Sequence, residues 1–472
     1  MTDSVRTRFA PSPTGALHLG NARTALLNGL FAAHHGGRLL VRSEDSDAER
    51  SDERYLQQML QDLLWLGLDW DEGPDRGGAV GPYRQSERQA QYQADLEHLC
   101  ADDHAYPCFC TPEELEAARK RQLAAGRPPR YPGTCARLSE AERAERRAAG
   151  RVPTLRFRVP DRGSIAFDDL VYGRQTYRLA DIGDFIIARG DGTPAFFFAN
   201  AIDDARMGVS HVLRGEDHLS NTPRQLLLLQ AVGLDAPRYG HFGLTLGDDG
   251  QPLSKRHGAV SVADLRADGY RPEALVNHLL RLGYTPGGEG LLTFAELAAD
   301  FDASRLGHGG ARHESRQLEV WQRRAIERLD VQAFWEWLQA FRPADVPDVP
   351  VDGPRFAAVV QPNVERPADG WRWARALFDP EAEPDPDAGR EINAAGPVFY
   401  RTALGVQQPA PHEDFRGWAR AVGEVTGARG RGLFRPLRAA LTGAVEGPEL
   451  ADAVALMPPT LIERRLRAAA AD

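Results

Sequence analysis

The chain has little cysteine and no long apolar run. Only four of its 472 residues are cysteines, too few for a disulfide framework, and two of them form a tight Cys108-Phe-Cys110 pair. No apolar run approaches the roughly 18 residues that a membrane span needs, and the opening MTDSVRTRF is polar and charged. These absences exclude a disulfide-rich secreted module and a membrane-spanning protein. We therefore expect a cytoplasmic protein.

The sequence also lacks an excess of positive charge. It has 57 lysines and arginines against 67 acidic residues, a formal net charge of −10, so the overall charge does not indicate a nucleic-acid-binding protein. Any contact with nucleic acid must come from local basic patches. Two stretches qualify, residues 119–130 and the ARGRGLFRPLR stretch at residues 428–438. Such charge runs are usually solvated faces, and composition does not separate the two roles.

The remaining composition is that of an ordinary globular protein. Hydrophobic residues make up 42% of the chain and charged residues 26%, which is enough to build sizeable cores. The length predicts about three domains.

Strand and helix patterns alternate in the first third of the chain. Residues 5–10 alternate as a strand, a Pro/Gly turn follows at residues 11–15, and a helical pattern runs from about residue 21 to the glycines at 36–37. A short apolar strand at residues 38–42 and a helix from residue 51 to about 67 complete a βαβ unit. This order predicts an α/β fold, a doubly wound parallel nucleotide-binding domain of the Rossmann type.

The pattern changes between residues 108 and 185. A helix with a capping-box start at Thr111 leads into a basic Gly/Pro loop. Segments with strand patterns follow, which indicates an α+β insertion. Alternating signals return with FIIARG, FFFANAI and a helix around residues 226–231, and the chain is mostly helical from about residue 265. We predict four parts: a catalytic domain at 1–107 and 186–250, an insertion at 108–185, a helical region at 251–325 carrying the LSKR loop, and an all-α domain at 326–472.

The first segment with chemical meaning runs from Arg8 to Asn21. It places a rigid Pro-Gly loop, His18 and Gly20 at the start of a helix, where free backbone N–H groups and the positive dipole end favour phosphate. Gly20 lets a nucleotide approach the backbone, while His18 and Asn21 can donate to phosphate oxygens. On spacing alone, a histidine at a helix start is more often a local cap.

The second segment is Ser254-Lys255-Arg256, after a Gly/Asp-rich loop at residues 247–250. A lysine in such a loop can close over a polyphosphate and stabilise the charge that develops in a transition state. Taken alone, the segment is only another exposed basic loop.

Together these segments resemble the HIGH and KMSKS signatures of class I aminoacyl-tRNA synthetases. The text between them, RSEDSDAERS at residues 42–51 and RGEDHLSNTPRQ at residues 214–225, narrows the resemblance to the glutamyl-tRNA synthetases of bacterial type. LFRPLRAALTG at residues 433–443 is similar to that family's anticodon-binding region. The resemblance covers nearly the whole chain.

The resemblance implies ATP-dependent ligation of L-glutamate to tRNA(Glu) through glutamyl-adenylate, with Mg²⁺ accompanying ATP. The nucleophile is a substrate carboxylate that is already ionised at pH 7, so the residues need only position it and stabilise charge. His18 and Lys255 match the catalytic positions. The positions that match ATP contacts are His18, Gly20, Asn21, Ser254, Lys255 and Arg256, and those that match glutamate contacts are Arg8, Ser12, Glu44, Phe196, Asn200 and Arg214.

The chain departs from the family pattern at three positions. Phe196 stands where a tyrosine is common, which removes one hydroxyl donor, and Pro252 replaces the first lysine of the second signature. Arg137 stands where zinc-containing members have a metal ligand, and a guanidinium cannot ligate zinc. The resemblance leaves two states open for this insertion: a zinc site, or a reduced, metal-free knuckle. The zinc ligands would be Cys108, Cys110, Cys135 and Tyr131, with His104 as a further candidate.

Several alternatives remain at this stage. The enzyme could also charge tRNA(Gln), or it could be a relative of the shortened enzyme that glutamylates queuosine in tRNA, although that enzyme lacks the region beyond about residue 325. A glutaminyl-tRNA synthetase fits less well, because its C-terminal part is β-barrel and AFWEWLQAF and LRAALTGAV here read as helices. An RNA-binding paralogue without catalysis would not need Lys255. The family resemblance suggests a monomer.

Overall fold

The computed structural model describes residues 4–47, 50–247, 250–251, 253 and 260–471. Its contacts divide the chain into two compact units, residues 1–265 with 275–317, and residues 266–274 with 318–472. Each unit is described here by itself. The four-part domain division predicted above stays a prediction.

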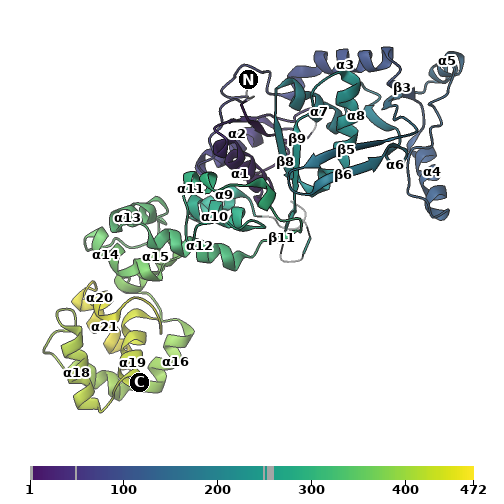
Figure 1. The fold of residues 1–472 in the computed structure, drawn as a ribbon. Coiled ribbons are helices and arrows are strands. Elements are labelled where there is room, and N and C mark those ends of the chain that lie inside the picture. The colour runs from purple at the N-terminus through teal and green to yellow at the C-terminus, as the bar shows by residue number, and fades with distance from the viewer. Residues whose placement is uncertain (1–3, 48–49, 248–249, 252, 254–259, 472) are drawn as a thin grey trace. The chain divides into compact units, whose positions relative to one another are not determined.

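Two pairs of parallel strands organise the first unit (Figure 1). Strand β1 (Arg6–Phe9) pairs in parallel with β2 (Arg38–Val41), and helix α1 (Leu19–His34) connects them. A second parallel pair, β8 (His211–Gly215) and β9 (Arg238–Phe242), is connected by α8 (Thr222–Val232). The backbone N–H of Ser210 donates to the carbonyl of Arg6 at 2.9 Å and joins the two pairs. The predicted α/β fold with parallel strands is confirmed.

Buried apolar side chains hold the helices and strands of this unit together. The inner face of α1 is buried along its length, and β2 is buried at three consecutive positions, as expected of a strand covered on both faces. The remaining elements of this part are α2 (Glu53–Trp65), η1 (Gln85–Arg88), α3 (Gln89–Ala101), α7 (Phe196–Arg206) and η2 (Glu216–Asn221). The FFFANAI segment forms the first two turns of α7.

The strands between residues 105 and 188, a range that includes the predicted insertion, pair in antiparallel. Strands β3 (Ala105–Cys108), β4 (Thr154–Phe157) and β7 (Phe185–Ala188) form one sheet, and β5 (Ser164–Asp169) with β6 (Gly173–Arg178) forms a hairpin. The helices between these strands are α4 (Pro112–Ala124), α5 (Glu140–Ala148) and α6 (Leu179–Ile182). The predicted capping box is present. The Thr111 side chain accepts from the Glu114 backbone N–H, and the Glu114 carboxylate accepts from the Thr111 backbone N–H.

A short parallel pair of strands follows in the same unit. It consists of β10 (Thr245–Leu246) and β11 (Ala311–Arg312). The helices of this region are α9 (Val262–Ala267), α10 (Pro272–Arg281), α11 (Phe294–Ala299) and η4 (Ala303–Arg305).

The second unit is helical where it is described. Its core is built on large aromatic side chains, with Trp371, Trp418, Phe334 and Phe356 fully buried. Both segments predicted as helices begin in helices: AFWEWLQAF is helical up to residue 340, and LRAALTGAV is helical up to residue 442, where Gly443 ends the helix. The elements are α12 (Ser315–Glu327), α13 (Val331–Ala340), α14 (Gly353–Val360), η5 (Gln361–Asn363), α15 (Pro367–Phe378), α16 (Pro386–Ala395), α17 (Pro397–Gly405), α18 (Phe415–Thr426), α19 (Arg431–Thr442), α20 (Leu450–Val454) and α21 (Pro459–Ala469).

Among the described residues, no helix combines the length and the apolar character needed to cross a bilayer.

Candidate active site

A pocket of about 440 Å³ opens where β1 and β8 end and α1 begins. Ligands of parallel α/β sheets bind at this edge, because the loops that leave the carboxyl ends of the strands diverge there. The structure gathers nine of the predicted site residues around this one pocket: Arg8, Ser12, His18, Gly20, Asn21, Glu44, Phe196, Asn200 and Arg214. The other three, Ser254, Lys255 and Arg256, lie outside the described residues.

The start of α1 forms the phosphate side of the pocket. His18 is the N-cap residue, and its Nδ1 accepts from the backbone N–H of Asn21 at 3.4 Å. The neutral ring therefore carries its proton on Nε2. The first turn contains no acidic residue, so the positive end of the helix is not neutralised within the helix. A Cβ at position 20 would lie 3.3 Å from the His18 ring, so Gly20 gives that ring its room.

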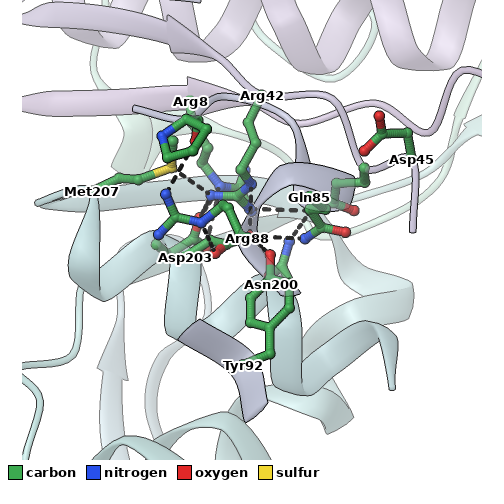
Figure 2. Close-up of polar contacts among 12 residues, drawn as sticks. Arg8, Arg42, Asp45, Gln85, Arg88, Tyr92, Asn200, Asp203 and Met207 are labelled. Atoms are coloured by element: carbon green, nitrogen blue, oxygen red, sulfur yellow. Dashed lines mark hydrogen bonds and ion pairs between the residues drawn. The ribbon is translucent and has the colours of Figure 1, made fainter. Parts of the chain in front are cut away.

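A network of buried charges lies behind the pocket (Figure 2). The side chain of Arg42 is fully buried, and its Nη1 donates to Asp204 Oδ1 at 2.7 Å while Nη2 donates to Glu44 Oε1 at 3.0 Å. Burial alone would lower the pKa of Arg42, but the charges of Asp204, Asp203 and Glu44 outweigh burial and raise it. Arg42 is thus a fixed cation that holds the acids in place.

Arg8 and Glu44 bring this network to the pocket surface. The Nε of Arg8 lies 3.3 Å from both carboxylate oxygens of Asp204. Asp204 is buried, which raises a carboxyl pKa, yet Arg8 and Arg42 outweigh that effect and lower it. Glu44 accepts from the Asn200 amide at 2.6 Å, and burial keeps its pKa raised despite Arg42 and Asn200.

Asp203 anchors the network from α7, as Figure 2 shows. Its carboxylate accepts from Arg88 Nε at 2.6 Å, from the Tyr92 hydroxyl at 2.7 Å and from the Gln85 amide at 3.0 Å. All of these groups are buried. The carboxylate is therefore satisfied away from the pocket, and its role is to position α7.

Arg214 differs from the other buried arginines. It is 5% exposed and forms no ion pair with any carboxylate in the described part of the chain. Its Nε donates to His241 Nε2 at 3.0 Å, and its Nη2 donates to Thr222 Oγ1 at 2.8 Å and to Gln225 Oε1 at 2.7 Å. Burial lowers the pKa of Arg214 to about 10, so it stays charged at pH 7. The Nη1 group has no partner among the described residues and lies at the pocket.

A second cluster lies in the insertion. The sulfurs of Cys108, Cys110 and Cys135 all lie within 4.8 Å of one another. The Tyr131 hydroxyl lies 3.4 Å from Cys108 Sγ and 3.7 Å from Cys110 Sγ, and Cys110 Sγ lies 3.7 Å from Cys135 Sγ. Arg156 stacks on the Tyr131 ring at 3.8 Å from its centroid. His104 is not a member of this cluster; its ring stacks on Phe157 instead.

The comparison with known families agrees with this geometry. The family described as tRNA synthetases class I (E and Q), catalytic domain, matches residues 4–320. The chain belongs to this family.

Curated class I synthetases match the chain over nearly its whole length. Glutamate–tRNA ligase 2 of Alkalilimnicola ehrlichii is 53% identical over 470 residues, covering 99% of this chain and 98% of the relative. Glutamate–tRNA ligase 2 of Nitrosococcus oceani is 52% identical over 465 residues, covering 98% of each. Among solved structures, a glutamate tRNA ligase from Elizabethkingia meningosepticum in complex with its amino acid has a TM-score of 0.84 at 28% identity and covers 99% of each chain.

One departure from the synthetase pattern can be located. Phe196 lies at the pocket mouth with 46% of its surface exposed, and its ring centroid lies 5.8 Å from that of His218. Burial lowers the pKa of His218 to about 4, so this imidazole is neutral at pH 7.

Sequence reasoning missed several residues of this synthetase site. Arg42, His218 and Gln225 lie within segments that carried the family resemblance, yet no role was assigned to them. The adjacent acids Asp203 and Asp204 had a usable signal, because paired carboxylates in an otherwise apolar helix such as FFFANAIDDAR require buried cations. His241 and Asp169 had no such signal. The partners of His241 are Arg214 and Asp169, which lie 27 and 72 positions away in the sequence.

Proposed function

We propose that the chain ligates L-glutamate to tRNA(Glu) with ATP complexed to Mg²⁺, through glutamyl-adenylate. The observation that carries the proposal is Arg214, a buried cation at the pocket with no carboxylate against it. Asp204 and Asp217 compensate the charge of Arg214 only from a distance, and burying a charge without a paired anion is costly, so a bound anion would complete the site. A carboxylate oxygen accepts a charge-assisted bond from an N–H of Nη1 and brings a negative charge to Arg214, whereas an amide oxygen accepts the bond without bringing a charge.

In the first step, an oxygen of the glutamate α-carboxylate attacks the α-phosphorus of ATP. The bond from that phosphorus to the bridging oxygen breaks, and diphosphate leaves. The α1 N-terminus and His18 Nε2–H provide donors for the phosphate oxygens. Glu44 lies where a carboxylate can hold the substrate ammonium group, with Asn200 fixing its orientation. Lys255 is proposed to stabilise the charge that develops on the phosphates.

In the second step, a terminal ribose hydroxyl of the tRNA attacks the glutamyl carbonyl, and AMP leaves. The tRNA needs cationic surface, and the second unit has a pocket of about 850 Å³ lined by Arg416, Arg420, Arg429 and Arg438, by the 44% exposed Phe434, and by Glu424 and Glu449. Arg416 pairs with Glu449 at 3.6 Å, so Arg420 and Arg429 are the better candidates for contact with phosphate. Arg435, which the sequence also marked, is engaged by Glu391 at 2.9 Å. The acidic chain would therefore contact tRNA through patches, with a steep salt dependence.

We also propose that the insertion holds a structural zinc ion. Zn–S bonds of about 2.3 Å at tetrahedral angles place two sulfurs about 3.8 Å apart, and a Zn–O bond of about 2.0 Å places oxygen about 3.5 Å from sulfur. The 3.7 Å between Cys110 and Cys135 and the 3.4 and 3.7 Å to Tyr131 match this geometry. The Cys135 backbone N–H donates to the Tyr131 oxygen at 2.8 Å, which supports that oxygen as a ligand. Zinc would tie the start of the insertion to the segment that carries Tyr131 and Cys135, and it would take no part in either chemical step.

The test is aminoacylation with labelled glutamate and, separately, glutamine, on purified tRNA(Glu) and tRNA(Gln). Transfer of glutamate to tRNA(Glu) is the expected result. Transfer to tRNA(Gln) as well would make the enzyme non-discriminating, and labelling of queuosine-containing tRNA alone would support the modifying relative. No transfer of glutamate to any tRNA would overturn the proposal.

A further inference from the structure

Arg214 rests against a buried histidine rather than against an acid. On the far side of that ring, His241 Nδ1 lies 2.6 Å from Asp169 Oδ2. The side chains of Asp169 and His241 are fully buried. The three residues come from β5, β8 and β9, so the chain Asp169–His241–Arg214 forms only when the insertion hairpin packs on the catalytic sheet.

The donors and acceptors around His241 determine its tautomer. A guanidinium Nε–H can only donate, so His241 Nε2 must accept from Arg214. Thr222 Oγ1 lies 3.1 Å from the same nitrogen, and its hydroxyl can donate either to that nitrogen or to the carbonyl of His218. The ring proton then lies on Nδ1 and is donated to Asp169. Asp169 Oδ1 is occupied separately, because it accepts from the backbone N–H groups of Val171 and Tyr172 at 2.9 Å each and of His241 at 3.2 Å.

We propose that Asp169 and His241 are positioning residues for glutamate, orienting Arg214 so that its Nη1 group meets a carboxylate of the substrate. This inference rests on the proposed function. The Nε bond to His241 and the two Nη2 bonds hold the plane of the guanidinium in one orientation. Among the described residues, only the Nη1 group is left without a partner. Holding a donor in place before binding increases affinity because less orientation is lost when the ligand arrives.

The surroundings keep the ring neutral. Burial lowers the pKa of His241, and the charge of Arg214 lowers it further, against the opposing influence of Asp169 and Asp217. The remaining titratable group packed on the ring is Tyr239, stacked at 6.2 Å between centroids. A neutral imidazole with a fixed tautomer is the state that the Arg214 bond requires.

The substitution Asp169→Asn tests the inference. The amide oxygen of asparagine would take the three backbone N–H groups, which leaves its NH₂ facing His241 Nδ1. That nitrogen must then accept, the ring proton moves to Nε2, and two donors face each other at Arg214. A carboxylate that fixes a histidine tautomer has this same vulnerability in hydrolase triads. We expect the KM for glutamate to rise about 10- to 100-fold with kcat within about threefold, and the KM for ATP unchanged.

Asp168→Asn is the matched control, because Asp168 is the neighbouring acid, is largely exposed and pairs only with exposed Arg174. It should behave as the wild type. A KM for glutamate within about twofold of wild type in folded Asp169→Asn, or equal rises in KM for glutamate and ATP, would overturn the inference.

A second pair of variants tests the same inference if Asp169→Asn does not fold. Glutamine at position 241 can donate to Asp169 and accept from Arg214, so His241→Gln should retain more glutamate affinity than His241→Phe, which keeps a ring without hydrogen bonds. Equal effects would contradict the inference.

Nitrogen-15 NMR of histidine-labelled wild-type protein provides a readout without substrate. We expect His241 to be neutral with its proton on Nδ1 at pH 7. A proton on Nε2, or a charged ring, would overturn the inference even if glutamate transfer is normal. Absence of glutamate transfer by wild-type enzyme would instead overturn the proposed function and leave the NMR result standing.

Discussion

Arg42 Nη1 lies 2.7 Å from Asp204 Oδ1, although the two residues are 162 positions apart in the sequence, and both side chains are excluded from solvent. Arg42 follows β2, and Asp204 belongs to α7 beyond the insertion. The pair therefore joins the two parts of the catalytic fold that the insertion separates. Because Arg8 also contacts Asp204, the same pair supports the substrate pocket.

Asp204→Asn should destabilise the first unit by about 3 to 5 kcal/mol, because it leaves Arg42 and Arg8 without a full counter-charge in a buried site. Urea unfolding at pH 7 measures the change. Asp191→Asn, at an exposed loop acid, is the control and should change the free energy of unfolding by less than about 0.5 kcal/mol. Similar losses in both variants would contradict the role of the buried pair.

Arg214→Gln should reduce kcat/KM for glutamate at least about 100-fold, since it removes the charge that compensates the substrate carboxylate. ATP binding should persist, because the phosphate side of the pocket is formed by α1. Steady-state kinetics with each substrate varied in turn provide the measurement. If glutamine becomes the better amino-acid substrate of the variant, the charge argument is supported further; unchanged use of glutamate would refute it.

The contact between buried His278 and half-buried His313 should make stability depend on pH. Their ring nitrogens lie 2.7 Å apart, and burial lowers the pKa of His278 to about 3. The folded state keeps this ring neutral, whereas the unfolded chain takes up a proton below pH 6.5. The free energy of unfolding should therefore fall as pH drops from about 6.5, by up to about 1.4 kcal/mol per pH unit.

His278→Gln retains an N–H donor toward His313 but cannot be protonated, so its unfolding free energy should depend less steeply on pH. Urea unfolding of both proteins at pH 7, 6 and 5 makes the comparison. Parallel curves for the two proteins would show that His278 does not contribute.

Protein purified without added metal should contain about one equivalent of zinc by elemental analysis. Cys135→Ser should lose it, and Tyr131→Phe should bind it more weakly because one ligand is removed. Cys100→Ser is the control, since Cys100 is exposed and outside the cluster. Less than a tenth of an equivalent in the wild type would refute the zinc site and leave a reduced, metal-free knuckle.

Periodate-oxidised ATP should label Lys255. The chain has two lysines, Lys120 and Lys255, so a dialdehyde that reacts with amines has few targets. Lys120 is largely exposed on α4 and serves as the internal control. Mass spectrometry should show labelling of Lys255 that ATP suppresses and labelling of Lys120 that ATP does not affect. Equal protection or no labelling at Lys255 would contradict its place at the ATP phosphates.

The sequence alone was sufficient to predict those helices and strands that neighbouring residues determine. The capping box at Thr111, the strand at residues 38–41 and the helices of the second unit each follow from periodicity or from a capping residue within a few positions. The phosphate side of the pocket was equally readable, because His18, Gly20 and Asn21 occupy one helix start. Family resemblance then placed Arg8, Glu44 and Arg214 at a common site before any contact was known.

Only the tertiary structure decided which charges meet. The sequence gives no means of pairing Arg42 with Asp204 or His241 with Asp169, because such pairs are chosen by the packing of strands and helices far apart in the chain. The structure also separated four arginines that look alike in the sequence: Arg8, Arg42 and Arg88 contact buried acids, and Arg214 contacts neutral groups and faces the pocket. Periodicity and capping act over one or two turns of chain, whereas the electrostatic environment of a buried group is the sum of all neighbours that folding brings to it.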